Sequence, residues 1–351
     1  MKLHIVGLPH TQTTPDYVWC AYTAKITKFC TMMTRLGYEV YLYGGSENSA
    51  EVTEHVEVVD DADREKWFGH YDWDRHVFNG FQSDAEWWVV MNARVVTEIT
   101  KRAEPGDMLG IIAGGCQQSL AKSLPDLVPV EWGIGYSGVW APYRVYESYA
   151  WMHYLAARRK DDDVRYYDTV IPNYFDPADF NPRAGTDGEY LLFLGRHTAR
   201  KGLAVVKEIT ERSDIPVITA GQGSERVPGA KYVGVVRGQD KADLIAGARA
   251  LLCPTTYLEP FGGVAVEAML SGTPAISTDY GAFTETIAQG VSGYRCSTLG
   301  DFMHAVREGA TLDRQGVIDH AQKYTMENVA PMYDSYFKRL EQLQGDGWYT
   351  L

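Results

Sequence analysis

Short apolar runs alternate with longer segments of helical periodicity along most of the chain. Near the N-terminus, an apolar run at 3–7, a helical pattern at 23–35 and a second apolar run at 39–43 predict one βαβ unit. This alternation is typical of a parallel sheet with crossover helices. Further first-half elements are predicted as helices at 85–102, 117–124 and 143–159 and as strands at 108–113 and 127–131.

The second half repeats the alternation more regularly. Its predicted strands are at 190–194, 216–220, 231–233, 250–253 and 275–278, and its predicted helices are at 202–212, 242–248, 263–270 and 325–343. Two Rossmann-like α/β domains follow from this pattern. A segment rich in proline and turn formers at 170–177 separates them. We therefore predict an N-terminal domain at 1–172 and a C-terminal domain at 173–331, with a helix at about 332–351 returning to the first domain.

Glycines and cations follow the predicted strands of the second domain. Gly195 and Arg196 come after the first of these strands, Gly221 after the next and Gly234 after the third. In open α/β sheets ligands bind at the carboxyl ends of the strands. Glycine lets a ligand approach the backbone, and cations suit phosphate. The spacing predicts a nucleotide or sugar-nucleotide site in this domain.

Two glutamates flank the start of the helix predicted at 263–270. Gly262 and Gly263 open this helix, whose unpaired N–H groups can receive a phosphate, while Glu259 precedes it and Glu267 lies in its second turn. Carboxylates repel phosphate, so their natural partners are hydroxyl groups of a sugar and of a ribose. The alternative is a helix N-terminal charge with a solvated glutamate.

Together with Lys201, these residues form a pattern that resembles the family 4 retaining glycosyltransferases, which have the GT-B fold of two Rossmann-like domains facing each other across a cleft. The resemblance covers about 170–293. Its matching pieces are Gly195-Arg196 with Lys201-Gly202, Gly221 with Gly223, Cys253-Pro254-Thr255, the two glutamates around Phe261-Gly262, Gly272-Thr273-Pro274, and the segment VIPNYFDPADF at 170–180.

The resemblance implies transfer of a hexose-like sugar from a UDP- or GDP-sugar to a hydroxyl acceptor with retention. On this interpretation, Arg196 and Lys201 hold the diphosphate, Glu259 faces the donor sugar and Glu267 binds the ribose. The backbone near Gly234 meets the base, and amides of Phe261, Gly262 and Gly263 lie near the sugar. Preorganised cations and amides stabilise the charge of a leaving diphosphate.

The two cations also imply a reaction without a metal or other cofactor, because they take the role that a divalent ion plays in the other main transferase fold. An acidic run at 161–163 lies between basic residues and away from any predicted strand end. We interpret this run as a solvated charged turn rather than a metal site.

The acceptor side departs from the family pattern. A hydroxyl-rich stretch at 9–17 replaces the glycine-rich loop that commonly follows the first strand, and the middle strand is not followed by the usual histidine. Candidate acceptor-binding residues are Glu131 and Tyr136 after the middle strand, together with His10 and Thr11 after the first. Core glutamate and packed tyrosine are the alternative interpretation.

Composition changes this picture in two ways. Eight of nine tryptophans lie between Trp19 and Trp151, which favours an aromatic acceptor side. The formal charge of -13 opposes general binding to a polyanion. Five scattered cysteines and the lack of a long apolar stretch argue against a disulfide framework and a membrane span, so we expect a soluble, cytoplasmic protein.

Two alternatives to a transferase stay open at this point. The chain could be a GT-B sugar-nucleotide epimerase, or a non-catalytic protein that binds sugar nucleotides. As a transferase, it has an unidentified acceptor. The patterns at 20–23 and 147–153 are similar to transferases some of whose relatives glycosylate modified DNA bases, so nucleic acid enters only as a candidate acceptor. No residue pattern specifies an oligomeric state.

Overall fold

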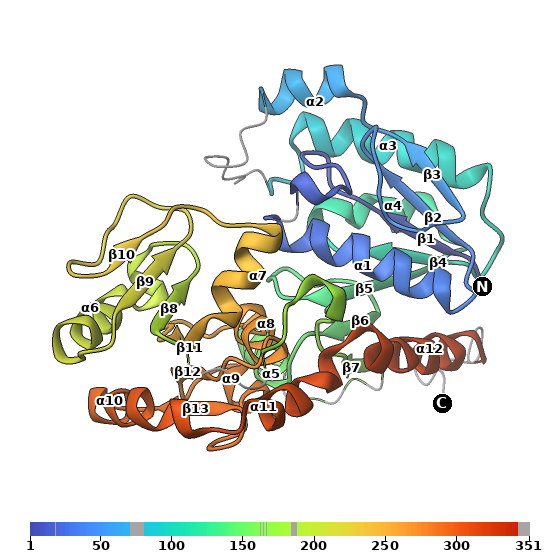
Figure 1. Cartoon of the computed structure of the whole chain (residues 1–351). Helices are drawn as coiled ribbons and strands as arrows, with labels where there is room; N and C mark the ends of the chain where they lie inside the picture. Colours follow the sequence, from blue (N-terminus) through green and yellow to red (C-terminus); the bar gives the residue numbers. More distant parts are fainter. Residues whose placement is uncertain are drawn as a thin grey trace. The chain divides into compact units, whose positions relative to one another are not determined.

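The computed structural model describes residues 1–17, 19–70, 81–161, 163, 165, 167–183 and 188–342. The chain divides into two compact units (Figure 1). The first comprises Met1–Glu147, Leu155–Tyr174 and the chain from Val329 onward, and the second comprises Ser148–Tyr154 and Phe175–Asn328. Each unit is built on one parallel sheet with helices, which confirms the predicted α/β fold class.

The first unit contains a seven-stranded sheet. Its strands in spatial order are β3 (Glu54–Glu57), β2 (Val40–Gly44), β1 (Leu3–Val6), β4 (Met108–Ile111), β5 (Val128–Ile134), β6 (Tyr143–Tyr146) and β7 (Asp168–Val170). All neighbouring strands are parallel. The strand order reverses between β1 and β4, and such a switch point is where open α/β sheets place ligands.

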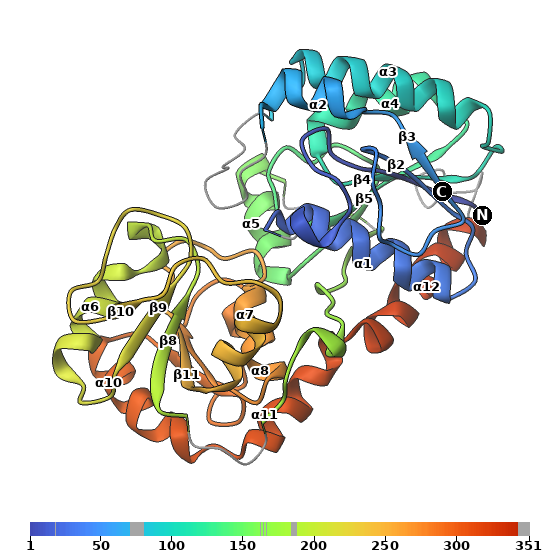
Figure 2. The same cartoon turned by 45° about the horizontal axis from the view of Figure 1, so that its top comes forward.

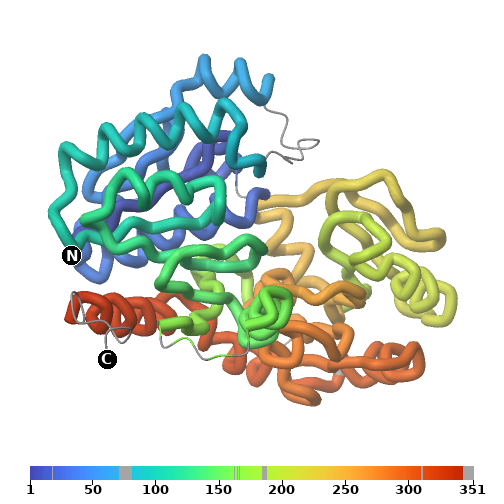
Figure 3. Tube along the Cα trace, turned by 180° about the vertical axis from the view of Figure 1, so that it is seen from behind, coloured from blue at the N-terminus to red at the C-terminus, as the bar shows by residue number. Residues whose placement is uncertain are grey.

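Helices cover both faces of this first sheet. Figure 2 shows α1 (Ala21–Arg35) on one face and α3 (Glu86–Thr100) and α4 (Gln118–Ser123) on the other. The short helix α2 (Asp61–Phe68) precedes α3. The final helix α12 (Met326–Gln342) lies along the first unit, as Figure 3 shows in red, and the ring of its Tyr333 is 5.1 Å from that of Phe29 on α1. Residues 343–351 of the predicted C-terminal helix lie outside the described residues.

The second unit contains a six-stranded parallel sheet. Its spatial order is β10 (Lys231–Tyr232), β9 (Val217–Ala220), β8 (Tyr190–Leu194), β11 (Ala248–Cys253), β12 (Ala275–Thr278) and β13 (Gly293–Cys296). This is the Rossmann order, with its switch point between β8 and β11. Its helices are α6 (Leu203–Arg212), α7 (Gly238–Ala246), α8 (Gly263–Leu270), α9 (Phe283–Thr286), α10 (Leu299–Glu308) and α11 (Arg314–Ala321).

Strands buried on both faces explain the uninterrupted apolar runs of this half. Leu191 and Phe193 of β8 belong to a cluster with α6 and α10, whereas Leu192 between them belongs to a cluster with α7, α8 and α11. Neighbouring side chains on a strand point to opposite faces, so each face has its own core. Short 3-10 helices occur in the connections, namely η1 (Pro15–Tyr17), η2 (Gly114–Gln117), η3 (Pro177–Asp179), η4 (Ala199–Lys201), η5 (Gly309–Thr311) and η6 (Gln322–Tyr324).

The segment 143–159 was predicted as a single helix, and this prediction is wrong. It forms strand β6 followed by helix α5 (Tyr149–Arg159). β6 pairs with β5 on one side and β7 on the other, a tertiary context that overrides the local pattern. The start of α5 groups with the second unit because Ser148 Oγ donates a hydrogen bond to the Pro260 carbonyl at 2.6 Å. Glu285 accepts the adjoining amides of Tyr149 and Ala150 at 3.0 and 2.7 Å.

Candidate active site

Glycine turns at the carboxyl ends of β8, β9 and β10 lie against one another. The Gly195 amide donates to the carbonyl of Ala220 at 3.0 Å, and the Gly221 amide donates to the carbonyl of Gly234 at 2.9 Å. Gly221 has a φ of 132°, and a Cβ there would lie 2.0 Å from the Gly195 carbonyl oxygen. Only glycine fits at this contact, which brings three backbone turns together at one edge of the sheet.

Lys201 and Glu259 form an ion pair at the switch point of the second sheet. Lys201 ends η4 after β8, and Glu259 lies in the loop after β11; their Nζ and Oε2 atoms are 2.8 Å apart. The side chains keep 21% and 14% of their surface exposed, so both groups can still reach a ligand. Burial alone would lower the pKa of Lys201, but the adjacent carboxylate and Tyr257 outweigh it and raise that pKa. Lys201 is therefore a cation at neutral pH.

Backbone contacts between the two loops hold this pair in place. The Thr256 amide donates to the Arg200 carbonyl at 2.9 Å. Gly202 has a φ of 82°, and a Cβ there would lie 1.9 Å from the carbonyl oxygen of Pro254. The loop after β8 thus touches the loop after β11 directly, which fixes the separation of the lysine and the glutamate.

Tyr257 is a site residue that sequence reasoning missed. The guanidinium carbon of Arg200 lies 4.5 Å from its ring centroid, and Lys201 Nζ lies 5.0 Å from the same centroid. Cations are attracted to the face of an aromatic ring at such distances. Tyr257 therefore gathers two cations beside Glu259. Its position two residues before that glutamate is the only signal in the sequence that could have indicated it.

The start of α8 places backbone amides next to Glu259. Gly262 has a φ of 78°, and a Cβ there would meet the Phe283 ring at 2.4 Å. Gly263 begins the helix, so its amide belongs to the unpaired group that favours an anion. The Phe261 side chain is 2% exposed and stacks on Phe175, so only the backbone of Phe261 can contribute to a site.

Glu267 has a partner that the sequence did not suggest. Its Oε1 atom lies 2.8 Å from Nζ of Lys241 on α7. Burial raises the pKa of the Cys253 thiol at the end of β11, and the charges of Lys201, Glu259 and Glu267 also act on it. Arg196 is exposed on the same loop as Lys201. Among the predicted site residues of the second unit, the structure pairs Lys201 with Glu259 and joins the turns at Gly195, Gly221 and Gly234.

The acceptor-side candidates occupy the first unit. His10 is 5% exposed, with its ring centroid 6.3 Å from that of Phe81. Thr11 is 4% exposed, and its hydroxyl lies 2.7 Å from that of Thr23 on α1. Both residues follow β1 as expected, but neither presents an exposed side chain. They pack beneath the surface at the carboxyl end of the sheet.

Glu131 stands in the middle of β5 rather than at a strand end, because β5 continues to Ile134. Its side chain is fully buried. Oε2 accepts the amides of Trp140 and Ala141 at 2.7 and 2.8 Å, and Oε1 accepts the Tyr136 hydroxyl at 3.2 Å. Burial raises the pKa of Glu131, and these hydrogen bonds oppose the rise. The carboxylate organises the loop after β5. The prediction that Glu131 faces a ligand at a strand end is therefore wrong.

Replacing Glu131 with alanine is expected to lower the free energy of unfolding by about 2–4 kcal/mol. The change leaves the amides of Trp140 and Ala141 without an acceptor, and each buried unsatisfied donor costs about 1–3 kcal/mol. Glu131→Gln keeps one oxygen for both amides and should retain most of the stability. Urea unfolding curves of the two variants would measure the difference. Equal loss in both would contradict the anchoring role.

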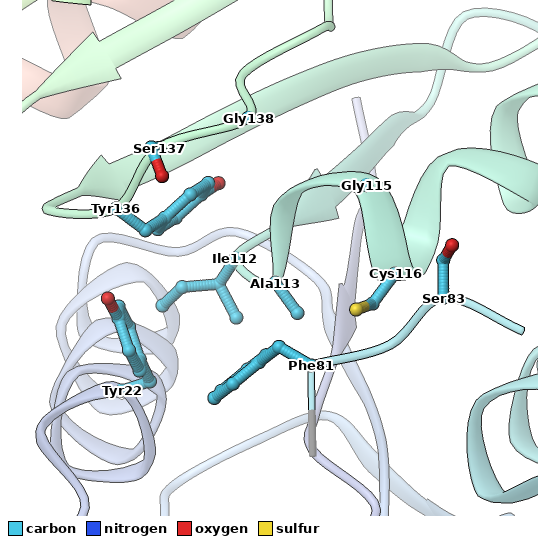
Figure 4. Close-up of a pocket in the computed structure, with 10 residues that line it drawn as sticks. All are labelled: Tyr22, Phe81, Ser83, Ile112, Ala113, Gly115, Cys116, Tyr136, Ser137 and Gly138. Atoms are coloured by element: carbon cyan, nitrogen blue, oxygen red, sulfur yellow. The ribbon is translucent and has the colours of Figure 1, made fainter. Parts of the chain in front are cut away.

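A pocket of about 410 Å³ opens beside this loop, at the carboxyl ends of β4 and β5. Figure 4 shows Tyr136 on one side and Tyr22 and Phe81 on the other, with Ile112 and Ala113 between them. Tyr136 is the acceptor-side candidate that lines the pocket. Sequence reasoning did not identify Tyr22 and Phe81, although both belong to the aromatic-rich half of the chain.

The acidic run at 161–163 has surface ion pairs where it is described. Asp161 lies 3.8 Å from Arg159 and 3.7 Å from Arg165, and Asp162 lies outside the described residues. Among the described residues, no helix is both long and apolar enough to cross a membrane.

Sequence comparison relates the second unit to known enzymes. Residues 188–309 match the family model described as Glycosyl transferases group 1. A phosphatidyl-myo-inositol mannosyltransferase of Mycobacterium tuberculosis is 30% identical over 186 residues, which is 44% of this chain and 49% of the relative. An uncharacterized glycosyltransferase of Methanocaldococcus jannaschii is 32% identical over 184 residues, which is 45% of this chain and 47% of the relative. The chain thus spans about half the length of the curated relatives it matches.

Solved structures match nearly the whole chain. A glycosyltransferase involved in avilamycin A biosynthesis has a TM-score of 0.68 at 20% identity, covering 97% of this chain and 98% of its own. HepE of Anabaena, solved with UDP and glucose, has a TM-score of 0.67 at 13% identity, and the match covers 96% of this chain and 99% of HepE. These likenesses establish the fold. The chain has the GT-B fold, as the resemblance in sequence implied.

Proposed function

We propose that this protein is a retaining glycosyltransferase that moves a sugar from a nucleoside diphosphate sugar to a hydroxyl acceptor. The observation that carries the proposal is the Lys201–Glu259 pair, held at the switch point of the second sheet. The matched family segment at 188–309 includes both residues. UDP in the HepE structure supports a nucleoside diphosphate as the leaving group.

The roles of the cations follow from charge. As the bond between the sugar and the diphosphate breaks, negative charge grows on the phosphate oxygens. Arg196 and Lys201 would stabilise that charge, with help from the amides at the start of α8. Arg200, which shares the Tyr257 ring with Lys201, adds a third positive charge to this loop.

The two glutamates would bind hydroxyl groups. Glu259 would accept hydrogen bonds from the donor sugar, and Glu267 from the ribose, while the turn at Gly234 meets the base. Because Glu259 is ion-paired with Lys201, we assign it no covalent bond to the sugar. In the proposed reaction, the acceptor oxygen attacks from the side of the leaving diphosphate. The acceptor proton passes to a phosphate oxygen. Because the acceptor attacks on the face that the diphosphate leaves, the anomeric configuration is retained without an enzyme nucleophile.

A panel of UDP- and GDP-sugars, scored by release of nucleoside diphosphate in the presence of hydroxyl acceptors, tests the proposal. Arg196→Ala and Glu259→Ala should abolish release while the protein stays folded. Arg212→Ala and Glu208→Ala are matched controls, because these exposed residues of α6 pair with each other on the helix surface. Product stereochemistry, determined by NMR, would test retention.

The alternatives give different results in the same assay. An epimerase would convert the donor to an isomer without any acceptor. A non-catalytic binding protein would bind the donor without releasing nucleoside diphosphate. Full activity in both Arg196→Ala and Glu259→Ala would contradict the assignment of the site.

Transfer is expected to persist in excess EDTA, because side-chain cations rather than a bound metal ion would neutralise the diphosphate. The measurement compares initial rates with EDTA, with added Mg²⁺ or Mn²⁺, and in untreated enzyme. A fall of more than about tenfold in the initial rate with EDTA, reversed by added metal, would show that a divalent ion stabilises part of the transition-state charge.

A further inference from the structure

The pocket of the first unit has the size of a ligand site. Its volume of about 410 Å³ falls within the range of about 300–1,000 Å³ typical of small-molecule pockets. It lies where β4 and β5 end, next to the switch point of the first sheet, which is the expected place for a ligand in an open α/β sheet.

Three aromatic rings form the walls of this pocket (Figure 4). The Tyr22 centroid lies 5.9 Å from that of Tyr136 and 6.4 Å from that of Phe81. The Tyr136 hydroxyl donates to Glu131 at 3.2 Å, which fixes that wall, whereas the Phe81 ring is 45% exposed. Such rings suit the apolar face of a sugar or the plane of an aromatic group, and the hydroxyls of Ser83 and Ser137 add polar contacts at the margin.

The described residues that line the pocket carry no charge to offer an ionic ligand. None of the ten described residues that line it is acidic or basic, and burial raises the pKa of the Cys116 thiol to about 11, so it is neutral. The nearby Glu131 carboxylate is engaged by the loop after β5. Lys25, whose Nζ lies 4.9 Å from the Tyr22 centroid, is ion-paired with Glu147 and donates to the Gly133 carbonyl.

We infer that this pocket binds the acceptor, and that the acceptor is an uncharged hydroxyl compound with a flat apolar ring face, such as a neutral saccharide or an aryl glycoside. A phosphate or carboxylate group would find no counter-charge among the described lining residues, and desolvating an unpaired ion is costly. The inference rests on the proposed transferase function, since it specifies the acceptor class for that reaction.

Gly115 offers a direct way to block the pocket. It lines the pocket, and a Cβ built there meets no atom within 4 Å, so Gly115→Leu fills space without a clash at the first carbon. Gly300→Leu is the matched control, because Gly300 is exposed on α10 and its Cβ would have its nearest contact at 3.5 Å. Tyr22→Ala removes one aromatic wall as a second, independent change.

Binding is measured first without donor, by ligand-observed NMR or calorimetry, with phenyl glucoside, methyl glucoside and glucose 6-phosphate as probes. We expect the two neutral glycosides to bind and glucose 6-phosphate to bind at least about tenfold more weakly. Stronger binding of phenyl than methyl glucoside would indicate an aryl group as the preferred ring. Gly115→Leu and Tyr22→Ala should each weaken neutral-probe binding by about tenfold or more.

UDP and GDP binding to the same variants separates the two proposals. Unchanged nucleotide affinity with lost probe binding supports the acceptor pocket. Equal or tighter binding of glucose 6-phosphate, or probe binding untouched by both variants, would overturn it. If the probes bind as expected but no donor releases nucleoside diphosphate, the transferase function fails, and the acceptor assignment fails with it.

Discussion

Replacing Lys201 with alanine is expected to reduce kcat for nucleoside diphosphate release by about 10²–10³-fold, the usual effect of removing one preorganised stabiliser of transition-state charge. Lys201 is positioned by η4 and by contact with the loop after β11, and it is protonated at neutral pH. Its charge acts most strongly on the leaving diphosphate, so the loss should appear in kcat more than in KM.

The fold should survive this change. The Glu259 carboxylate left behind keeps only 14% of its side chain exposed, so the lost stability should exceed the roughly 1 kcal/mol of an exposed ion pair but stay below the roughly 3–5 kcal/mol of a fully buried one. Lys207→Ala, on an exposed face of the following helix, is the matched control and should have normal turnover. Lys201→Arg retains the charge and should recover part of kcat. A Lys201→Ala enzyme with parental kcat would remove Lys201 from the mechanism.

Replacing Gly202 with alanine should produce the largest loss of stability, about 2–5 kcal/mol. A left-handed φ of 82° costs an alanine about 1–2 kcal/mol. In addition, the new Cβ would lie 1.9 Å from the Pro254 carbonyl oxygen, and relieving such overlap costs about 1–3 kcal/mol. Because this contact joins the loops that carry Lys201 and Glu259, donor binding should weaken as well.

Gly290→Ala separates the two contributions to this loss. Gly290 has a similar φ of 70°, but a Cβ there meets no atom within 4 Å, so only the backbone cost applies. Urea unfolding and nucleotide affinity of both variants would provide the comparison. If Gly202→Ala were no less stable than Gly290→Ala, the close approach of the two loops would be wrong.

The elements of the second unit were the most predictable part of the fold. Strands β8, β11 and β12 lie within a few residues of their predicted positions. Each is buried on both faces, so its sequence is an apolar run that predicts a strand. Two edge strands of the first sheet, β3 and β7, lacked that signal because they are short and partly exposed. The inner strand β6 was predicted as helix because pairing with its neighbours, rather than local pattern, makes it a strand.

By itself, the sequence determined the α/β fold class, and it predicted a set of donor-site residues, because the topology brings glycines and charges after parallel strands to one sheet edge. Side-chain partners depended on residues distant along the chain. Lys241 reaches Glu267, Tyr257 gathers two cations, and Glu131 turns inward to anchor a loop. Only the tertiary structure decided these pairings and the aromatic pocket, since local periodicity carries no information on which distant side chains meet.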